Sequence, residues 1–415
     1  MERTPFYEKV RERLIRYAKI DTQSDPKSAE TPTAQKQFDL ARVLFHELRS
    51  IGASDVYLDE RACVVYAKIP ATRSGGRAFG LVTHMDTAPD APGANVRPWV
   101  LESYDGGDIV LNEEKGIVLS PKEFPNLKQY IGQDLVLTDG TTLLGGDDKA
   151  GIAAVMTFSE HLLSHPEIGH GPIALAFTPD EEVGGLAKDL DLSRFGASVA
   201  YTLDGDHLGF YMDETFHASQ ATLTFTGLSV HPATAKGVMI NASDLLGEFL
   251  SMLPRFEKPQ YTEGREGFFH VIAVQGSCER ASVELIVRDH DRTQFENREH
   301  YLRLCADALN ARYPGAAALS ISETYRNMKE VVDRHPYLIE ALTAAIGDAG
   351  LVPQSEPFRG GTDGSALSHR GLPCPNLSAG YENAHGRFEY VPIRSMEKNV
   401  EILLHLASRF AAMQN

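Results

Sequence analysis

Residues 173–184 read Ile-Ala-Leu-Ala-Phe-Thr-Pro-Asp-Glu-Glu-Val-Gly, an apolar strand followed closely by three acidic side chains. An uninterrupted apolar run of this length is typical of a strand buried on both faces, as in a sheet covered by helices. A helix is expected over 152–163, and further buried strands are expected at 64–69, 79–83, 135–138 and 199–203. Because helices alternate with these strands, the first half of the chain is predicted to be α/β with a largely parallel or mixed sheet.

The pattern changes after about Gly209, where strands with alternating apolar and polar residues begin. The order of the expected elements there is β-α-β-β-α-β, with strands at 221–226, 268–275, 282–288 and 318–324 and helices at 239–253 and 291–312. This order predicts an inserted ferredoxin-like domain. Since helix and strand alternation resumes beyond Asn327, the main domain is predicted to be discontinuous, covering 1–212 and 328–415, with the insertion at 213–327.

Composition excludes several classes of protein. Forty basic and 57 acidic side chains in 415 residues give a net charge of −17, which opposes binding to nucleic acid. No apolar stretch reaches the roughly 18 residues that a membrane span needs. The four cysteines form no CxxC pair, and the N-terminus resembles neither a secretory signal nor a transit peptide. We therefore expect a cytoplasmic protein with no membrane or nucleic-acid partner.

Histidines and acids recur where expected strands end. Each taken alone has an ordinary explanation: a histidine can be a hydrogen-bonded core residue, two acids can cap a helix, and three acids can form a solvated turn. The groups concerned are His84-Met85-Asp86, Gly146-Asp147-Asp148, Asp180-Glu181-Glu182, Asp204 and His385. Strand ends are where open α/β sheets build their sites, and imidazole with carboxylate but no thiolate suits a catalytic zinc centre.

Together these motifs resemble the zinc exopeptidase family that includes bacterial deacetylases, carboxypeptidases and dipeptidases. Two further stretches, Val230-His231-Pro232 and Arg359-Gly360-Gly361-Thr362-Asp363-Gly364, are similar to a branch of that family that acts on tripeptides. The resemblance covers nearly the whole chain. It implies an α/β/α zinc-exopeptidase catalytic domain with an inserted ferredoxin-like lid or dimerisation domain, and therefore a homodimer formed through the insertion.

The resemblance also implies roles for the strand-end residues, with two Zn²⁺ ions per subunit. His84 and Asp204 would bind one zinc, Glu182 and His385 the other, and Asp147 would bridge them. Asp86 would orient His84, and Glu181 would be the general base. A cis peptide bond is implied between Asp147 and Asp148.

Residues outside the metal ligands have less specific signals. His231 would stabilise the oxyanion, in its own or a partner subunit, whereas a lone loop histidine is more often a surface residue. Arg280 and Arg359 would hold the C-terminal carboxylate of a peptide, because arginine suits bidentate capture. An exposed arginine without such a role is the competing interpretation.

The resemblance therefore implies a zinc metalloaminopeptidase that releases the N-terminal residue from tripeptides. A deacylase or dipeptidase of the same family is the alternative enzyme, because the metal ligands do not determine the substrate. A non-catalytic peptide-binding scaffold is the alternative outside enzymes. Glu181 argues against the scaffold, since a base beside the metals is useful only for hydrolysis.

Overall fold

A computed structural model describes residues 3–413, and the chain divides into two compact units. Among the described residues, the first unit comprises 3–213, 330–356 and 362–413, and the second comprises 214–329 and 357–361. The short segment 357–361, which we expected in the main domain, thus groups with the second unit. Each unit has its own hydrophobic core.

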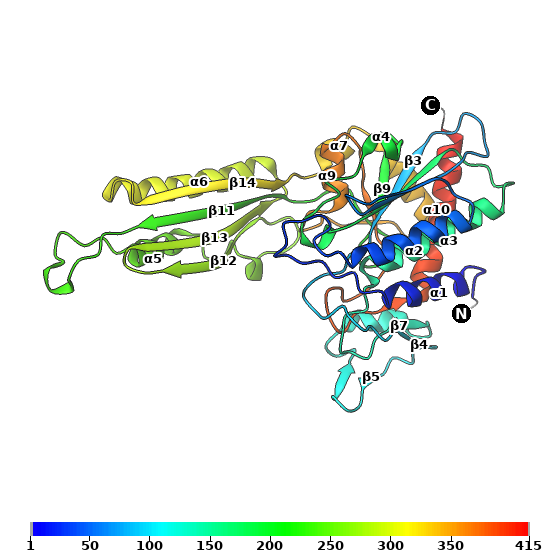
Figure 1. The fold of residues 1–415 in the computed structure, drawn as a ribbon, viewed down its shortest axis with the longest axis horizontal. Helices are drawn as coiled ribbons and strands as arrows, with labels where there is room; N and C mark the ends of the chain where they lie inside the picture. The colour runs from blue at the N-terminus through cyan, green and yellow to red at the C-terminus, as the bar shows by residue number, and fades with distance from the viewer. Residues whose placement is uncertain (1–2, 414–415) are drawn as a thin grey trace. The chain divides into compact units, whose positions relative to one another are not determined.

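The first unit is built on an eight-stranded mixed sheet (Figure 1). Its strand order is β1 (Ser54–Asp59), β2 (Val64–Ile69), β8 (Ile173–Thr178), β3 (Phe79–His84), β9 (Ala200–Leu203), β16 (Asn376–Leu377), β10 (Phe210–Met212) and β15 (Gln354–Ser355). The four central strands β8, β3, β9 and β16 run parallel to one another. Their carboxyl ends therefore lie at one edge of the sheet.

Helices cover both faces of this sheet, as the residues of β2 illustrate. Val65 and Ala67 belong to a large core cluster, whereas Val64 and Tyr66 belong to a second cluster. The large cluster includes buried residues of α1 (Tyr7–Ala18), α2 (Gln37–Ser50), α3 (Gly146–Ser164), α8 (Pro336–Asp348) and α10 (Ile393–Ala412). The second includes residues of α4 (Leu192–Phe195) and α9 (Asp363–His369). The predicted α/β/α arrangement is confirmed.

One predicted strand lies outside the main sheet. β7 (Leu135–Leu137) pairs with β4 (Trp99–Leu101) and β17 (Val391–Pro392) in a separate three-stranded sheet. β5 (Ile109–Asn112) and β6 (Ile117–Leu119) form a hairpin, and η1 (Pro125–Tyr130) follows them. These elements enclose a small core of their own. β7 is apolar because Leu135 and Leu137 pack in this small core and Val136 packs in the large cluster.

The second unit has the element order β-α-β-β-α-β. Its antiparallel sheet has the order β12 (Phe268–Gly276), β13 (Arg280–Asp289), β11 (His217–Thr226) and β14 (Ala317–Tyr325). Helices α5 (Ala242–Met252) and α6 (Arg292–Arg312) contribute buried residues to the core of this unit. Its role as a lid or dimerisation domain stays a prediction. Within 3–413, no helix is long and apolar enough to cross a membrane.

Candidate active site

Four of the five predicted metal ligands come from the carboxyl ends of the central parallel strands. His84 is the last residue of β3, Asp204 follows β9, and His385 lies in the loop after β16. Glu182 lies in the turn η2 (Glu181–Val183), which follows β8. The fifth, Asp147, lies at the start of α3, where its backbone and that of Asp148 are not helical. The peptide bond between these two aspartates is cis.

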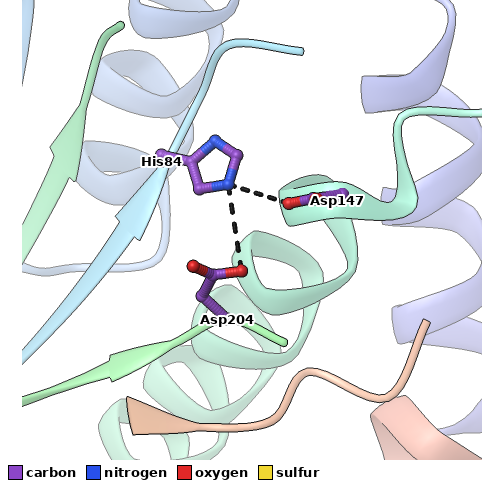
Figure 2. Close-up of side chains that lie close together, drawn as sticks. All are labelled: His84, Asp147 and Asp204. Atoms are coloured by element: carbon purple, nitrogen blue, oxygen red, sulfur yellow. Dashed lines mark hydrogen bonds and ion pairs between the residues drawn. The ribbon is translucent and has the colours of Figure 1, made fainter. Parts of the chain in front are cut away.

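The structure gathers His84, Asp147 and Asp204 into one group (Figure 2). Nε2 of His84 lies 2.9 Å from Oδ1 of Asp147 and 4.0 Å from Oδ1 of Asp204. We call these three residues the inner trio. The His84 side chain is 2% exposed, and its Nε2 faces both carboxylates.

A second group, which we call the outer trio, consists of Asp147, Glu182 and His385. Nε2 of His385 lies 3.2 Å from Oδ2 of Asp147 and 2.9 Å from Oε2 of Glu182. The two trios share one carboxylate, and each of its oxygens faces a different histidine. Asp147 is therefore arranged as a bridging ligand would be.

The donor set fits two divalent cations. In each trio the potential ligand atoms lie within 4.8 Å of one another, and together they offer two imidazoles and three carboxylates without a thiolate. This combination suits a catalytic zinc centre. Oε1 of Glu182 is buried and has no hydrogen-bond partner among residues 3–413, which is costly unless a cation or other partner satisfies it.

The electrostatics of these side chains give the same indication. Burial raises the pKa of Glu182 to about 8 and that of Asp204 to about 6, and the nearby charge of Asp147 adds to both shifts. Hydrogen bonds with Asp147 and Glu182 raise the pKa of His385 to about 11. The raised pKa values mean that these side chains tend to hold protons, and bound cations would displace those protons.

Asp86 connects the inner trio to the turn that carries Glu181. Its carboxylate accepts the backbone N–H groups of Glu181 at 3.0 Å and Glu182 at 3.2 Å. Nδ1 of His84 lies 3.2 Å from the carbonyl oxygen of Asp86 and 3.4 Å from its Oδ1. The sequence predicted Asp86 as a partner of His84 but did not predict its hydrogen bonds to the turn, because backbone N–H groups are the same whatever the residue type.

Glu181 lies beside these acids. Burial raises the pKa of its carboxyl group well above the usual value, and Asp204, Asp363 and Glu182 reinforce that shift. A carboxyl group with a raised pKa in such a cluster is a candidate general base. The turn places this residue next to the ligand Glu182, and Asp86 holds the backbone of both.

The three predicted substrate residues belong to the second unit, and the structure does not bring all of them together. Arg280 is the first residue of β13, whereas Arg288, near its other end, donates to the carbonyl of Arg359 at 3.1 Å. Eight residues of strand span about 27 Å. One chain therefore cannot hold a single carboxylate with both Arg280 and Arg359.

Arg359 also has partners of its own. Its guanidinium donates to the carbonyls of Gly264 at 2.7 Å and Glu266 at 2.9 Å, and to the hydroxyl of Thr262 at 2.8 Å. These bonds connect Arg359 to neighbouring segments, so a carboxylate ligand would have to share the guanidinium with them.

His231 is exposed at the start of η3 (Pro232–Thr234), and its Nδ1 accepts the N–H of Ala233 at 3.2 Å.

Glu389 is a site residue that sequence reasoning missed. Its buried carboxylate accepts three backbone N–H groups from the loop that carries Asp147. A single glutamate four residues after His385 carries no recognisable signal, because its partners are backbone groups more than 240 positions away.

Comparisons with known proteins identify the family of this chain. Residues 144–409 match the model of peptidase family M20/M25/M40. The chain is 48% identical over 401 residues to a protein named Peptidase T from Geobacillus kaustophilus (strain HTA426), covering 96% of this chain and 97% of that one. A protein of the same name from Geobacillus thermodenitrificans (strain NG80-2) is 47% identical over 401 residues, with the same coverage.

Solved structures show the same fold. The aminopeptidase PepT from Bacillus cereus ATCC 10987 superimposes with a TM-score of 0.78 at 21% identity, covering 98% of this chain and 99% of that one. A Bacillus subtilis protein described as a dinuclear metal binding peptidase of the M20 family gives a TM-score of 0.67 at 13% identity, covering 97% and 98%. From the matched family and the full-length relatives, the chain belongs to peptidase family M20/M25/M40.

Proposed function

We propose that this protein is a two-zinc aminopeptidase that removes the N-terminal residue from tripeptides. The observation that carries the proposal is the position of the Asp147 carboxylate between the two trios. One of its oxygens faces His84 and the other faces His385, and each trio adds one further carboxylate. Relatives named Peptidase T, 43–48% identical over 96–97% of the chain, support the choice of peptide substrate.

In this proposal His84, Asp147 and Asp204 hold one zinc, and Asp147, Glu182 and His385 hold the other. When bound, the two ions would lower the pKa of water and polarise a peptide carbonyl. The three ligand carboxylates would offset three of the four positive charges, so the two ions with these ligands would keep one positive charge towards the substrate. Alternative divalent metals are distinguished by measuring metal content and activity together.

Glu181 accepts a proton from the attacking water and delivers it to the amine that leaves. Burial and the neighbouring acids raise the pKa of Glu181, and cations bound in both trios would lower that pKa. Asp86 positions Glu181 through the backbone of the turn and positions His84 through its ring nitrogen.

Substrate recognition is proposed for the second unit. His231 and Arg280 both lie near the end of the sheet where β11 finishes and β13 begins, since Thr226 pairs with Arg280. We propose that His231 contacts the substrate carbonyl and that Arg280 or Arg359, not both in one chain, binds the terminal carboxylate. A homodimer formed through this unit is part of the same proposal, and analytical ultracentrifugation tests it.

We also propose that the enzyme acts in the cytoplasm. The four cysteines are free, and Cys63, Cys305 and Cys374 are buried, which suits a reducing compartment. Fractionation of cells that express the protein tests this placement.

The test of function is a chromatographic assay of the zinc-loaded protein on di-, tri-, tetra- and pentapeptides of one composition. We expect the N-terminal residue to be released from unblocked tripeptides much faster than from longer or N-acetylated ones. Equal cleavage of tripeptides and pentapeptides, or release of the C-terminal residue, would reject the proposed specificity. Preferential cleavage of dipeptides or of N-acetylated substrates would favour the dipeptidase or deacylase alternative. Zinc binding without any hydrolysis would favour the scaffold.

A further inference from the structure

Glu389 lies just before β17, and only 2% of it is exposed. Its Oε2 accepts the backbone N–H groups of Leu144 at 2.8 Å and Gly145 at 2.7 Å, and its Oε1 accepts that of Asp147 at 2.9 Å. One carboxylate thus binds the loop that leads into α3 at three points.

The loop that Glu389 holds cannot be fixed by regular helix bonds. Gly145 has a left-handed φ of 76°, and Asp147 has φ −77° and ψ 107°. A Cβ on Gly146 would lie 2.5 Å from Cγ2 of Val391 and 3.0 Å from Oε1 of Glu389. The loop therefore packs closely against the segment that carries Glu389, and the carboxylate binds N–H groups that the helix does not use.

The same segment carries a ligand of the outer trio. Glu382 and Tyr390 exchange backbone hydrogen bonds at 2.9 and 3.0 Å, which closes the loop that contains both His385 and Glu389. At the far side of this loop, Nε2 of His385 lies 3.2 Å from Oδ2 of Asp147. The loop thus meets the Asp147 region twice, once through a ligand side chain and once through a carboxylate that is not a ligand.

We propose that Glu389 is a positioning residue for the metal centre. Its carboxylate fixes the backbone of 144–147, so that Asp147 presents one oxygen to each trio, and it keeps the His385 loop in register with that backbone. This inference rests on the proposed function, because it assumes that the trios bind metal. Glu389 itself contacts neither metal nor substrate in the proposal.

A purely structural role would give different results, and a second buried glutamate supplies the control. Glu397 is 3% exposed, and its carboxylate accepts the backbone N–H of Thr4 at 2.8 Å. It therefore resembles Glu389 in burial and in its backbone partner, but it holds the N-terminal segment and not a loop of the site. Loss of Glu389 leaves three buried N–H groups without this acceptor, and loss of Glu397 leaves the partly buried N–H of Thr4 without it.

The experiment compares full-length Glu389→Ala, Glu389→Gln and Glu397→Ala with the wild type. Zinc affinity is measured by competition with a chelator at 25 °C, and stability by urea unfolding of the zinc-free proteins. We expect Glu389→Ala to lower zinc affinity by about 10- to 100-fold, the range found when groups that orient metal ligands are removed. Glu397→Ala should change zinc affinity less than about twofold, even where its unfolding midpoint falls as much.

Glu389→Gln should fall between Glu389→Ala and the wild type, because one amide oxygen can still accept from Leu144 and Gly145. It also carries the comparison if the alanine variant does not fold. Unchanged zinc affinity in the Glu389 variants, or an equal loss in Glu397→Ala, would overturn the inference. A wild type that binds zinc but spares tripeptides would instead overturn the proposed substrate, and the comparison of variants would still be decisive for Glu389.

Discussion

The inner and outer trios share Asp147 but are built differently. In the inner trio, the side chains of His84 and Asp204 are 2% and 14% exposed, and both residues lie at strand ends. In the outer trio, Glu182 is 4% exposed and His385 is 46% exposed, and both come from a turn or loop. His385 also has a left-handed φ of 63°.

This difference in exposure suggests that the two trios would differ in how firmly they retain a metal ion. Ligands on strands are held more precisely than ligands on loops. If both trios bind metal as proposed, we expect the inner trio to retain its ion longer, whereas the outer trio, with one side of His385 exposed, should exchange its ion more readily. The predictions below test whether the two trios behave as one unit or as two.

The largest effect is expected where the trios meet. Asp147→Asn removes a negative charge that both sites use, so both should lose metal. Because metals contribute several kcal/mol to such reactions, tripeptide cleavage should fall by more than about 10⁴-fold. Metal content by mass spectrometry and the rate of tripeptide cleavage check this. Retention of both ions would show that Asp147 is not shared.

Glu181→Gln should separate chemistry from metal binding. The variant lacks the proton acceptor but leaves both trios intact, so cleavage should fall by about 10²- to 10⁴-fold with unchanged zinc content. Glu182→Gln, one residue away in the same turn, is the matched control and should lower the occupancy of the outer site. Equal zinc content in these two variants would contradict their separate roles.

Much of this arrangement could be predicted from the sequence because of simple geometry. Parallel strands end at one edge of a sheet, so His84, Glu182 and Asp204 had to lie near one another once β3, β8 and β9 were identified. The contrast between the trios could not be predicted. Exposure of His385 depends on how its loop folds back, through the pairing of Glu382 with Tyr390.

Contacts to backbone atoms were also invisible in the sequence. The motif around Arg359 suggested carboxylate capture, yet its guanidinium binds the carbonyls of Gly264 and Glu266. Glu389 gave no signal at all for a similar reason. A motif identifies side chains that act on ligands. A side chain that binds backbone groups of a loop needs no particular residue types in that loop, so the loop sequence does not reveal the contact.

A smaller effect should distinguish His84→Ala from His385→Ala. Loss of His385 leaves the buried inner trio complete, so this variant should keep about one zinc per chain after dialysis. Loss of His84 leaves only the exposed outer trio, so less than one zinc should remain. Metal content before and after dialysis measures the difference. The reverse order would show that exposure does not govern retention.

The smallest expected effect is kinetic and needs no substitution. When an excess chelator is added to the zinc-loaded wild type, the ion of the outer trio should leave first, because the exposed side of His385 gives water and chelator direct access to it. The ion of the inner trio should follow more slowly, since water and chelator can replace His84 and Asp204 as its ligands only after local opening of the structure. We expect two phases of zinc release that differ by about tenfold, which corresponds to a difference of about 1.4 kcal/mol between the two barriers.

Because both ions act on one substrate in the proposed reaction, activity should disappear with the first phase. His385→Ala provides the control, since it should show the slow phase alone. A single phase for both ions in the wild type would mean that the trios open together and that the contrast in exposure has no kinetic consequence.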